Sequence, residues 1–236
     1  PLMKLRLATP SVLVDVGRLR DLSYIRDAGD HVAVGALTRH HDLEHSDLLA
    51  TDAPLLGHAA GQVGDPQVRH RGTIGGSIAH GDPASDLSAV LLALRATLVA
   101  QGPSGSREIG VDDFFTGFLE TALAPDELLT EIRVPKTGGL GWSFQKFNRR
   151  AQDWAIVGVA CVRNNGSTGI GLVNMASRPV RAAAAEAAVT SGASAADAAA
   201  VADEGTDPSA DLNASSDFRR HLARVLVRRA LEEAGA

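Results

Sequence analysis

The stretch from Arg71 to Leu87, RGTIGGSIAHGDPASDL, guides the interpretation of the whole chain. Two adjacent glycines, Gly75 and Gly76, stand between Thr73 and Ser77. Such a pair permits positive φ angles and lets another group approach closely. Hydroxyl groups and unpaired backbone N–H groups in a turn of this kind can bind phosphate oxygens. A purely structural turn before a helix has the same pattern, so both interpretations stay open on these residues alone.

The residues after the glycine pair favour a nucleotide. Asp82 is predicted to be an N-cap with Pro83 at the first helical position, and the positive end of a helix dipole suits an anion. Asp86 could then accept hydrogen bonds from ribose hydroxyls.

Length and composition limit the class of protein. The 236 residues suffice for one large domain or two ordinary ones, with 44% hydrophobic and 22% charged residues, as in globular proteins. The net charge of −5 gives no reason to expect nucleic-acid or anionic-membrane binding. No apolar run approaches the ~20 residues of a membrane span, and no signal peptide is evident, so we expect a cytoplasmic protein. The single cysteine, Cys161, excludes an internal disulfide and an iron–sulfur cluster held by this chain's own thiolates.

The hydrophobic pattern predicts an α+β protein, since strands are followed by helices packed on one face. The predicted strands are residues 3–7, 12–16, 23–26, 31–35, 96–100, 107–110, 127–134, 142–148, 155–163 and 169–175. The predicted helices are residues 40–49 with Thr38 as N-cap, 53–61, the helix starting at Asp82, 181–189, 195–202 and 217–234. Phe114, Phe115 and Phe118 are expected to face a core. The polar stretch 136–139 predicts a boundary between a domain of residues 1–136 and one of residues 137–236.

Two other patterns compete for a function. His41-x-x-Glu44-His45 is the inverted form of a zinc-protease motif, but no third ligand is evident in the sequence. We interpret it as a solvated helix, predict no stoichiometric zinc, and keep a zinc hydrolase as an alternative. The arginines of the last helix are interpreted as a solvated or subunit-facing surface, not a nucleic-acid site; they are Arg219, Arg220, Arg224, Arg228 and Arg229.

The stretch 71–77 with 79–87 resembles the second FAD loop of molybdenum hydroxylase flavoproteins. The resemblance is to the medium subunits of aerobic carbon monoxide dehydrogenase and the N-heterocycle hydroxylases. It continues through residues 2–8, 125–135, Lys146 with 149–155, and 218–223. It implies an FAD-binding domain of the PCMH (vanillyl-alcohol oxidase-like) type. Residues 1–15 would end its N-terminal subdomain, and residues 16–136 would form its second. A CO dehydrogenase flavoprotein C-terminal domain with a three-stranded antiparallel sheet and helices would follow.

The resemblance also implies site residues. The segment that wraps the FAD pyrophosphate, mostly through backbone N–H groups, would be Thr73, Ile74, Gly75, Gly76 and Ser77. Asp86 would bind a ribose or adenine-side hydroxyl, while the backbone around Leu129 and the side chain of Lys146 would lie near the flavin. Trp154 would stack close to the isoalloxazine. The family's other glycine loop, of the type Ala-Gly-Gly-x-Ser, would come immediately before Pro1, so we expect half of the pyrophosphate cradle in this sequence.

The implied function is that of an FAD-binding electron-transfer subunit in a heterotrimeric molybdenum hydroxylase, assembled as a dimer of heterotrimers. Electrons would leave the substrate at the molybdenum cofactor of a large subunit and cross two [2Fe–2S] clusters of a small subunit. FAD would receive them here for an external acceptor. No side chain of this chain is expected to be catalytic, and the substrate is not encoded in it. An FAD-free structural subunit of such a complex is the remaining alternative.

Overall fold

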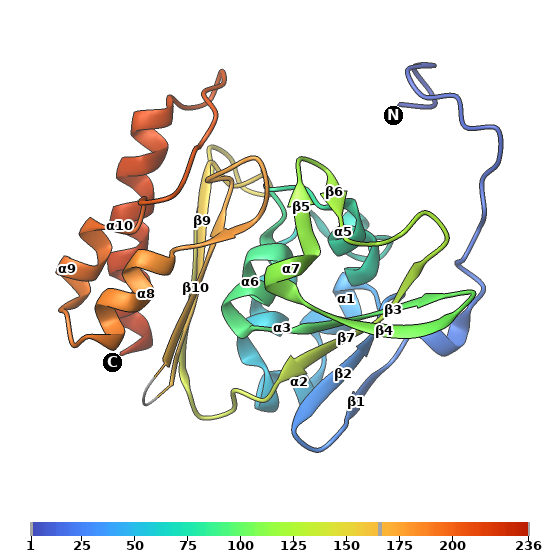
Figure 1. Cartoon of the computed structure of the whole chain (residues 1–236), viewed down its shortest axis with the longest axis horizontal. Helices are drawn as coiled ribbons and strands as arrows, with labels where there is room; N and C mark the ends of the chain where they lie inside the picture. Colours follow the sequence, from blue (N-terminus) through green and yellow to red (C-terminus); the bar gives the residue numbers. More distant parts are fainter. Residues whose placement is uncertain (1, 165–166, 236) are drawn as a thin grey trace.

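The computed structural model describes residues 2–164 and 167–235, which two antiparallel sheets organise (Figure 1). The first sheet has the order β1 (Ile25–Asp27), β2 (His31–Gly35), β7 (Leu128–Pro135), β3 (Thr97–Gly102) and β4 (Gly105–Gly110). The second has the order β11 (Val180–Arg181), β10 (Ser167–Val173), β9 (Val157–Asn164) and β8 (Gly141–Phe147). All of these neighbouring strands pair antiparallel, which confirms the predicted class.

Short helices follow the first hairpin and lead to a buried helix between the sheets. They are α1 (His40–Glu44), α2 (Asp47–Asp52), α3 (Pro54–Ala60), α4 (Pro66–Arg69) and α5 (Ile74–His80). Helix α6 (Asp86–Leu94) is buried along its whole length and lies between β7 of the first sheet and β9 and β10 of the second (Figure 1). The remaining small elements are the 3-10 turn η1 (Arg20–Leu22), α7 (Val111–Phe114), β5 (Phe115–Gly117) and β6 (Glu120–Thr121).

The second sheet is covered by helices on its other face. They are α8 (Ala183–Thr190), α9 (Ala195–Ala200) and the long α10 (Ser216–Ala234), as Figure 1 shows. Helix α6 packs directly on β10, because Gly171 carries no side chain: a Cβ there would fall far inside contact distance of the Ala89 carbonyl oxygen. Helix α6 is therefore a close link between the two sheets, and α3 also packs on β8 of the second sheet.

Several predicted elements are confirmed, with small shifts. The β1–β2 hairpin turns at residues 27–30, β3 pairs with β4, and β7 ends at Pro135. The last helix begins one residue earlier than predicted, with Ser215 as its N-cap. The second sheet has a fourth strand, β11, which the expectation of three strands missed. It spans only Val180–Arg181, too short to give a periodic signal.

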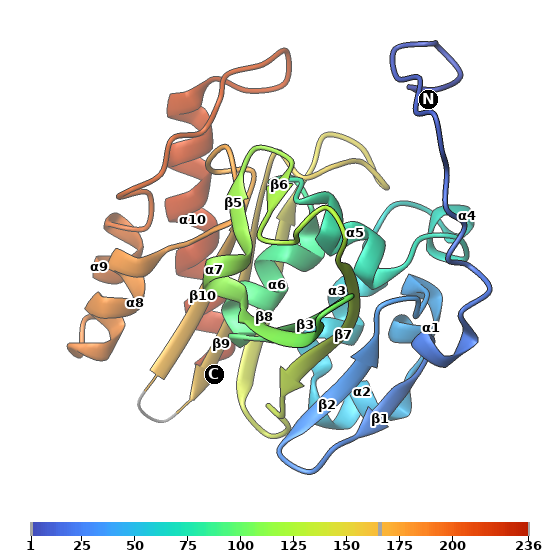
Figure 2. The ribbon, with the colours of Figure 1, turned by 45° about the vertical axis from the view of Figure 1, so that its right-hand side comes forward.

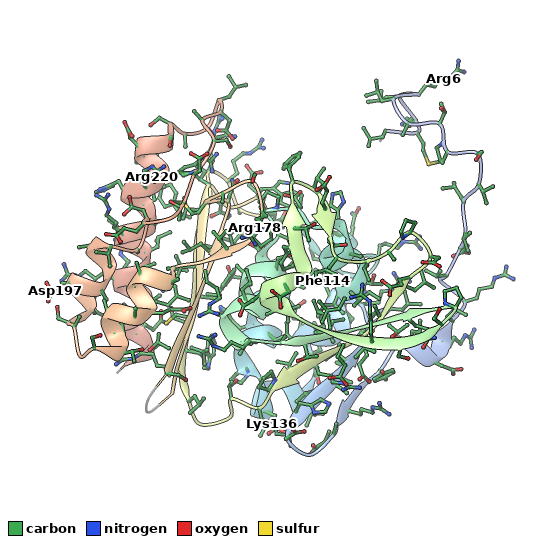
Figure 3. All side chains as sticks on the ribbon, viewed as in Figure 1. Arg6, Phe114, Lys136, Arg178, Asp197 and Arg220 are labelled. Atoms are coloured by element: carbon green, nitrogen blue, oxygen red, sulfur yellow. The ribbon has the colours of Figure 1, made fainter. Side chains whose placement is uncertain are left out.

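The strands predicted at residues 3–7 and 12–16 are wrong. These residues form turns and irregular chain that reach away from the body of the molecule, with Arg6 near the far end in Figure 3. Their apolar side chains are exposed, including Leu7 and Val14. An alternating pattern becomes a strand only beside a pairing partner, and no described strand lies beside these residues.

The helix predicted at residues 40–49 is two helices. Its predicted cap, Thr38, instead exchanges hydrogen bonds with the backbone of Tyr24, at 3.1 and 3.0 Å. Helix α1 ends at Glu44, and Ser46 caps α2 by accepting a hydrogen bond from the Leu49 N–H at 3.3 Å. The serine cap divides the predicted helix.

The prediction of a turn at the glycine pair and of an Asp82 cap is also wrong. The glycines lie in the first turn of α5, whose N-cap is Thr73. Gly81, with φ of 68°, ends α5, and Asp82 accepts a hydrogen bond from the Ala84 N–H at 2.8 Å. Ser85 then precedes α6 as its N-cap residue.

Two predicted side-chain environments also differ. Phe114 and Phe115 are buried as expected, but Phe118 is exposed at the β5–β6 turn. Arg219, assigned to a solvated face, is only 1% exposed and donates hydrogen bonds to the Ile156 carbonyl and to Asp211. Within the described residues, no helix combines the length and the apolar character that crossing a membrane requires.

Candidate functional site

The two glycines of α5 occupy different environments. Ile74 and Gly75 are buried, and their N–H groups donate to the carbonyls of Thr38 at 3.0 Å and Ala36 at 2.8 Å. A Cβ on Gly75 would come within 2.5 Å of the Ala36 Cβ, so this glycine is needed for packing. These two N–H groups are therefore already used, contrary to the prediction that they bind phosphate.

Gly76 is the exposed member of the pair. Its N–H lies 3.2 Å from the Thr73 hydroxyl oxygen. Apart from its chain neighbours and the backbone of its own helix, a Cβ at this position would approach only that oxygen within 4 Å among the described residues, at 2.9 Å. The outer face of Gly76 therefore stays open for close approach of another molecule.

A cavity of about 800 Å³ lies on this open face, between α5 and the segment that contains η1. It is lined by Val16, Gly17, Leu19, Arg20, Ser23, Leu37, Arg39, Arg71, Gly72, Thr73, Gly76, Ser77 and His80. The three arginines give this cavity a positive character, and arginine is well suited to bind phosphate oxygens. Arg39 is held in place because its guanidinium donates to the Arg71 carbonyl.

A second cavity of about 320 Å³ shares Gly72, Ser77 and His80 with the first. Its other lining residues are His40, Val63, Gly64, Asp65, Val68, Asp82, Ser85, Asp86, Leu87, Lys146, Gln152, Asp153 and Trp154. The two cavities thus adjoin along α5, and the volume of each lies in the range typical of ligand sites.

A buried ion pair belongs to the second cavity. Lys146, on β8, places its Nζ 2.7 Å from Asp86 Oδ2 at the start of α6 and 2.9 Å from the Gln62 carbonyl. Both side chains are less than one-tenth exposed. Burial raises the pKa of Asp86, and Lys146 opposes that rise. Asp86 Oδ1 has no partner among the described protein atoms, so it is free to accept a hydrogen bond from a ligand.

His40 forms a second polar group of this cavity. Its Nε2 lies 3.0 Å from the Ser77 hydroxyl. Burial, reinforced by the positive charges of Arg39 and Arg69, lowers the pKa of His40 to about 4. The imidazole is therefore neutral at neutral pH and orients Ser77 by hydrogen bonding.

The rim of the second cavity is the loop between β8 and β9, which lies above α5 in Figure 2. Trp154 lines the cavity but is 63% exposed, so one part of its ring is open to solvent. Gln152 adopts a positive φ of 67° in the same loop. An exposed aromatic side chain at a cavity rim is placed to cover a flat ligand.

The structure brings together most of the predicted site residues. Thr73, Gly76 and Ser77 line the larger cavity, while Asp86 and Lys146 meet in the smaller one. Leu129 lies outside both, in the β3–β7 ladder opposite Ala100.

Sequence reasoning missed several lining residues, and it did not pair Asp86 with Lys146. Arg71 and His80 lie within the quoted stretch and could have been included. His40 and Arg39 come from α1 and the residue before it, and no local pattern marks them.

Comparisons with known proteins give matches along almost the whole chain. The family model described as an FAD binding domain in molybdopterin dehydrogenase matches residues 1–137, and that of the CO dehydrogenase flavoprotein C-terminal domain matches residues 142–234. The chain is 39% identical to the carbon monoxide dehydrogenase medium chain of Hydrogenophaga pseudoflava, over 100% of this chain and 86% of that protein. It is 37% identical to the 6-hydroxypseudooxynicotine dehydrogenase complex subunit alpha of Paenarthrobacter nicotinovorans, over 99% of this chain and 83% of that protein. Its fold matches a chain of the carbon monoxide dehydrogenase from Hydrogenophaga pseudoflava that lacks the Mo-pyranopterin moiety, with a TM-score of 0.94 and 41% identity, covering 100% and 85% of the two chains.

Proposed function

The chain belongs to the family of FAD-binding domains in molybdopterin dehydrogenases, and we propose that it is the FAD-binding electron-transfer subunit of a heterotrimeric molybdenum hydroxylase. In this proposal it takes electrons from [2Fe–2S] clusters of a small partner subunit and delivers them to an external acceptor. A large partner subunit carries the molybdenum cofactor, and the complex is a cytoplasmic dimer of heterotrimers. The observation that carries the proposal is the pair of adjoining cavities along α5, in a chain that matches the family through both of its domains.

The residues of the two cavities fit FAD. The arginine-lined cavity beside Gly76 suits the pyrophosphate, with Thr73 and Ser77 as hydroxyl donors. The buried and unpartnered Asp86 Oδ1 suits a hydrogen-bond donor of the cofactor. Because Asp86 contacts Lys146, we assign both to the flavin end, in place of the ribose or adenine-side hydroxyl first expected for Asp86.

When bound, FAD supplies the redox chemistry of the subunit. The chain's own residues bind and orient it. The Asp86–Lys146 pair holds fixed charges beside the smaller cavity, neutral His40 orients the Ser77 hydroxyl, and Trp154 limits solvent access at the rim. We keep Ile74 and Gly75 in the proposed site, because they are buried and pack next to Gly76. We also keep Leu129, whose backbone is part of strand β7.

The domain division also remains a proposal, with residues 1–136 forming the FAD-binding domain and residues 137–236 the C-terminal domain. The first and second sheets fall on either side of this boundary, which supports it. The relatives act in complexes named for different substrates, carbon monoxide and 6-hydroxypseudooxynicotine. We therefore assign substrate choice to the large partner subunit.

The proposal is tested by the flavin content of the complete subunit purified with its partners. We expect a flavin absorption spectrum with stoichiometric FAD in the wild type. Gly76→Val should remove most of it, because a branched side chain would fill the open face of the larger cavity. Ala79→Val is the matched control, since Ala79 is exposed on the same helix and lines neither cavity.

Two results would contradict the assignment. Full flavin content in folded Gly76→Val would show that the open face is not the binding site. A wild-type complex without flavin would instead favour the FAD-free structural subunit. Circular dichroism of each variant separates loss of binding from loss of folding.

A further inference from the structure

A cluster of histidines lies on the surface between α1 and α4, outside the proposed cofactor site. His41, Glu44 and His45 each offer a ligand atom within 4.8 Å of the others. The ring of His70, which follows α4 as its C-cap, has its centroid 4.1 Å from that of His41. The His41 and His45 centroids are 4.3 Å apart. His70, at the end of α4 beside α1 in Figure 2, therefore stacks on a histidine of this group without belonging to it.

A hydrogen bond orients the His45 ring and leaves its Nε2 available to bind a metal ion. Its Nδ1 lies 2.8 Å from the carbonyl oxygen of His41. A carbonyl oxygen can only accept, so Nδ1 carries the proton of the neutral ring and Nε2 keeps its lone pair. Metal-binding histidines are commonly oriented by a hydrogen bond of this kind to a carbonyl group.

The charges around the cluster indicate which ion it suits. Glu44 is held by Arg69, whose Nε lies 2.8 Å from its Oε2, and Arg69 also donates to the Val63 and Gly64 carbonyls. One shared carboxylate is a poor site for calcium or magnesium, which prefer several oxygen ligands. Imidazole nitrogens suit zinc and similar transition metals. The side chains are accessible to an ion from solvent, since His45 and His70 are exposed.

We propose that His41, Glu44 and His45 bind one divalent transition-metal ion of the zinc type, and that the ring of His70, stacked on His41, orients that ligand from the end of α4. This proposal replaces the prediction of no stoichiometric zinc. These three protein ligands leave the fourth tetrahedral position to a water molecule or another donor. Helices α1 and α4 also supply His40 and Val68 to the wall of the smaller cavity. The bound ion would therefore stabilise that wall. This proposal does not depend on the proposed function.

Titration of the chelator-treated full chain with Zn²⁺ alone, followed by calorimetry, tests the site. We expect one saturable equivalent and a higher melting temperature with Zn²⁺. His70→Ala and His41→Ala should each weaken binding by about tenfold or more, because even an outer-shell contact is worth that much. His221→Ala is the matched control, since His221 is an exposed histidine on α10 and should leave binding unchanged.

Three results would overturn the proposal: no saturable Zn²⁺ binding by the folded wild type, wild-type affinity in His70→Ala, or an equal loss in His221→Ala. Circular dichroism of each variant without metal confirms that it is folded. The flavin content of the complete complex, measured separately, tests the proposed function, so failure of one proposal is distinguishable from failure of the other.

Discussion

Replacing Lys146 with methionine removes the ammonium group that lies on the buried carboxylate of Asp86. The substitution keeps a side chain of similar length but deletes the hydrogen bonds to Asp86 Oδ2 at 2.7 Å and to the Gln62 carbonyl at 2.9 Å. Both charged side chains are less than one-tenth exposed, so solvent screens the pair weakly. Breaking a buried pair by removing one partner costs about 3–5 kcal/mol. We expect Lys146→Met to lower the free energy of unfolding by an amount in this range at pH 7.

The loss should depend on pH with a defined sign. Burial already raises the pKa of Asp86 above its unfolded value, and without Lys146 nothing at that oxygen opposes the rise. A group whose folded pKa is raised stabilises the fold below its unfolded pKa and loses that contribution as pH rises through the folded pKa. The difference between wild type and Lys146→Met should therefore widen as pH rises and narrow as pH falls, because the protonated Asp86 needs no counter-ion.

Urea denaturation of the full chain between about pH 5 and pH 8 measures this difference. Lys136→Met is the matched control, because Lys136 pairs with Asp27 at 2.8 Å and Asp52 at 2.9 Å near the surface, at the lower edge of Figure 3. Hydrogen bonding to Lys136 lowers the pKa of Asp27, so this control should have a smaller effect that is constant over the same range and is lost only in acid.

A double-mutant cycle with Asp86→Asn completes the test. The two single substitutions should be non-additive, because each leaves the other partner buried. Additive losses, or a loss in Lys146→Met that is the same at pH 5 and pH 8, would refute the assignment of a buried and ionised pair.

Two further predictions concern stability, one from the close packing at Gly171 and one from the buried hydrogen bonds of Arg219. Gly171→Ala should lower the free energy of unfolding by about 1–3 kcal/mol, because the added Cβ meets the Ala89 backbone, whereas Gly110→Ala, with open space around it, should change little in the same denaturation assay. Arg219→Met should lower it by a similar amount of about 1–3 kcal/mol, because it removes the hydrogen bonds to Asp211 and to the Ile156 carbonyl, which keeps only the longer one from Asn174 at 3.4 Å. Arg220→Met, at a more exposed position, should have a smaller effect, and equal melting temperatures for these two variants would contradict the prediction.

The elements that the sequence predicted correctly contain local signals for a turn, a helix cap or an apolar face. The β3 and β4 strands are joined by a short glycine-containing turn, and α10 has a serine cap and a continuous apolar stripe. The segments at residues 3–7 and 12–16 show the limit of this reasoning. They alternate in the same way, but a strand also needs a neighbour, which no local pattern encodes.

The residues alone predicted only the part of the candidate site within residues 71–87, and Lys146 was expected only from the family resemblance. Asp82-Pro83 is a favourable helix start by local rules, yet α5 takes the preceding residues, because Thr73 caps it and Thr38 and Ala36 accept its N–H groups. These acceptors lie far earlier in the chain. For the same reason the neutral His40 beside Ser77 gave no signal in the sequence.

Gly75 and Gly76 are chemically identical neighbours, and the structure separates their roles. Gly75 is required because Ala36 occupies the space of a side chain, whereas a Cβ on Gly76 would meet the Thr73 hydroxyl at 2.9 Å and otherwise adjoin the larger cavity. Packing against the protein backbone therefore accounts for Gly75, whereas Gly76 adjoins one side-chain oxygen and the larger cavity. The same reasoning extends to Asp86 and Lys146, which come from α6 and β8 and meet at one cavity. A ligand that contacts both residues binds only when the second sheet is docked on α6, so its binding free energy must also stabilise that docking.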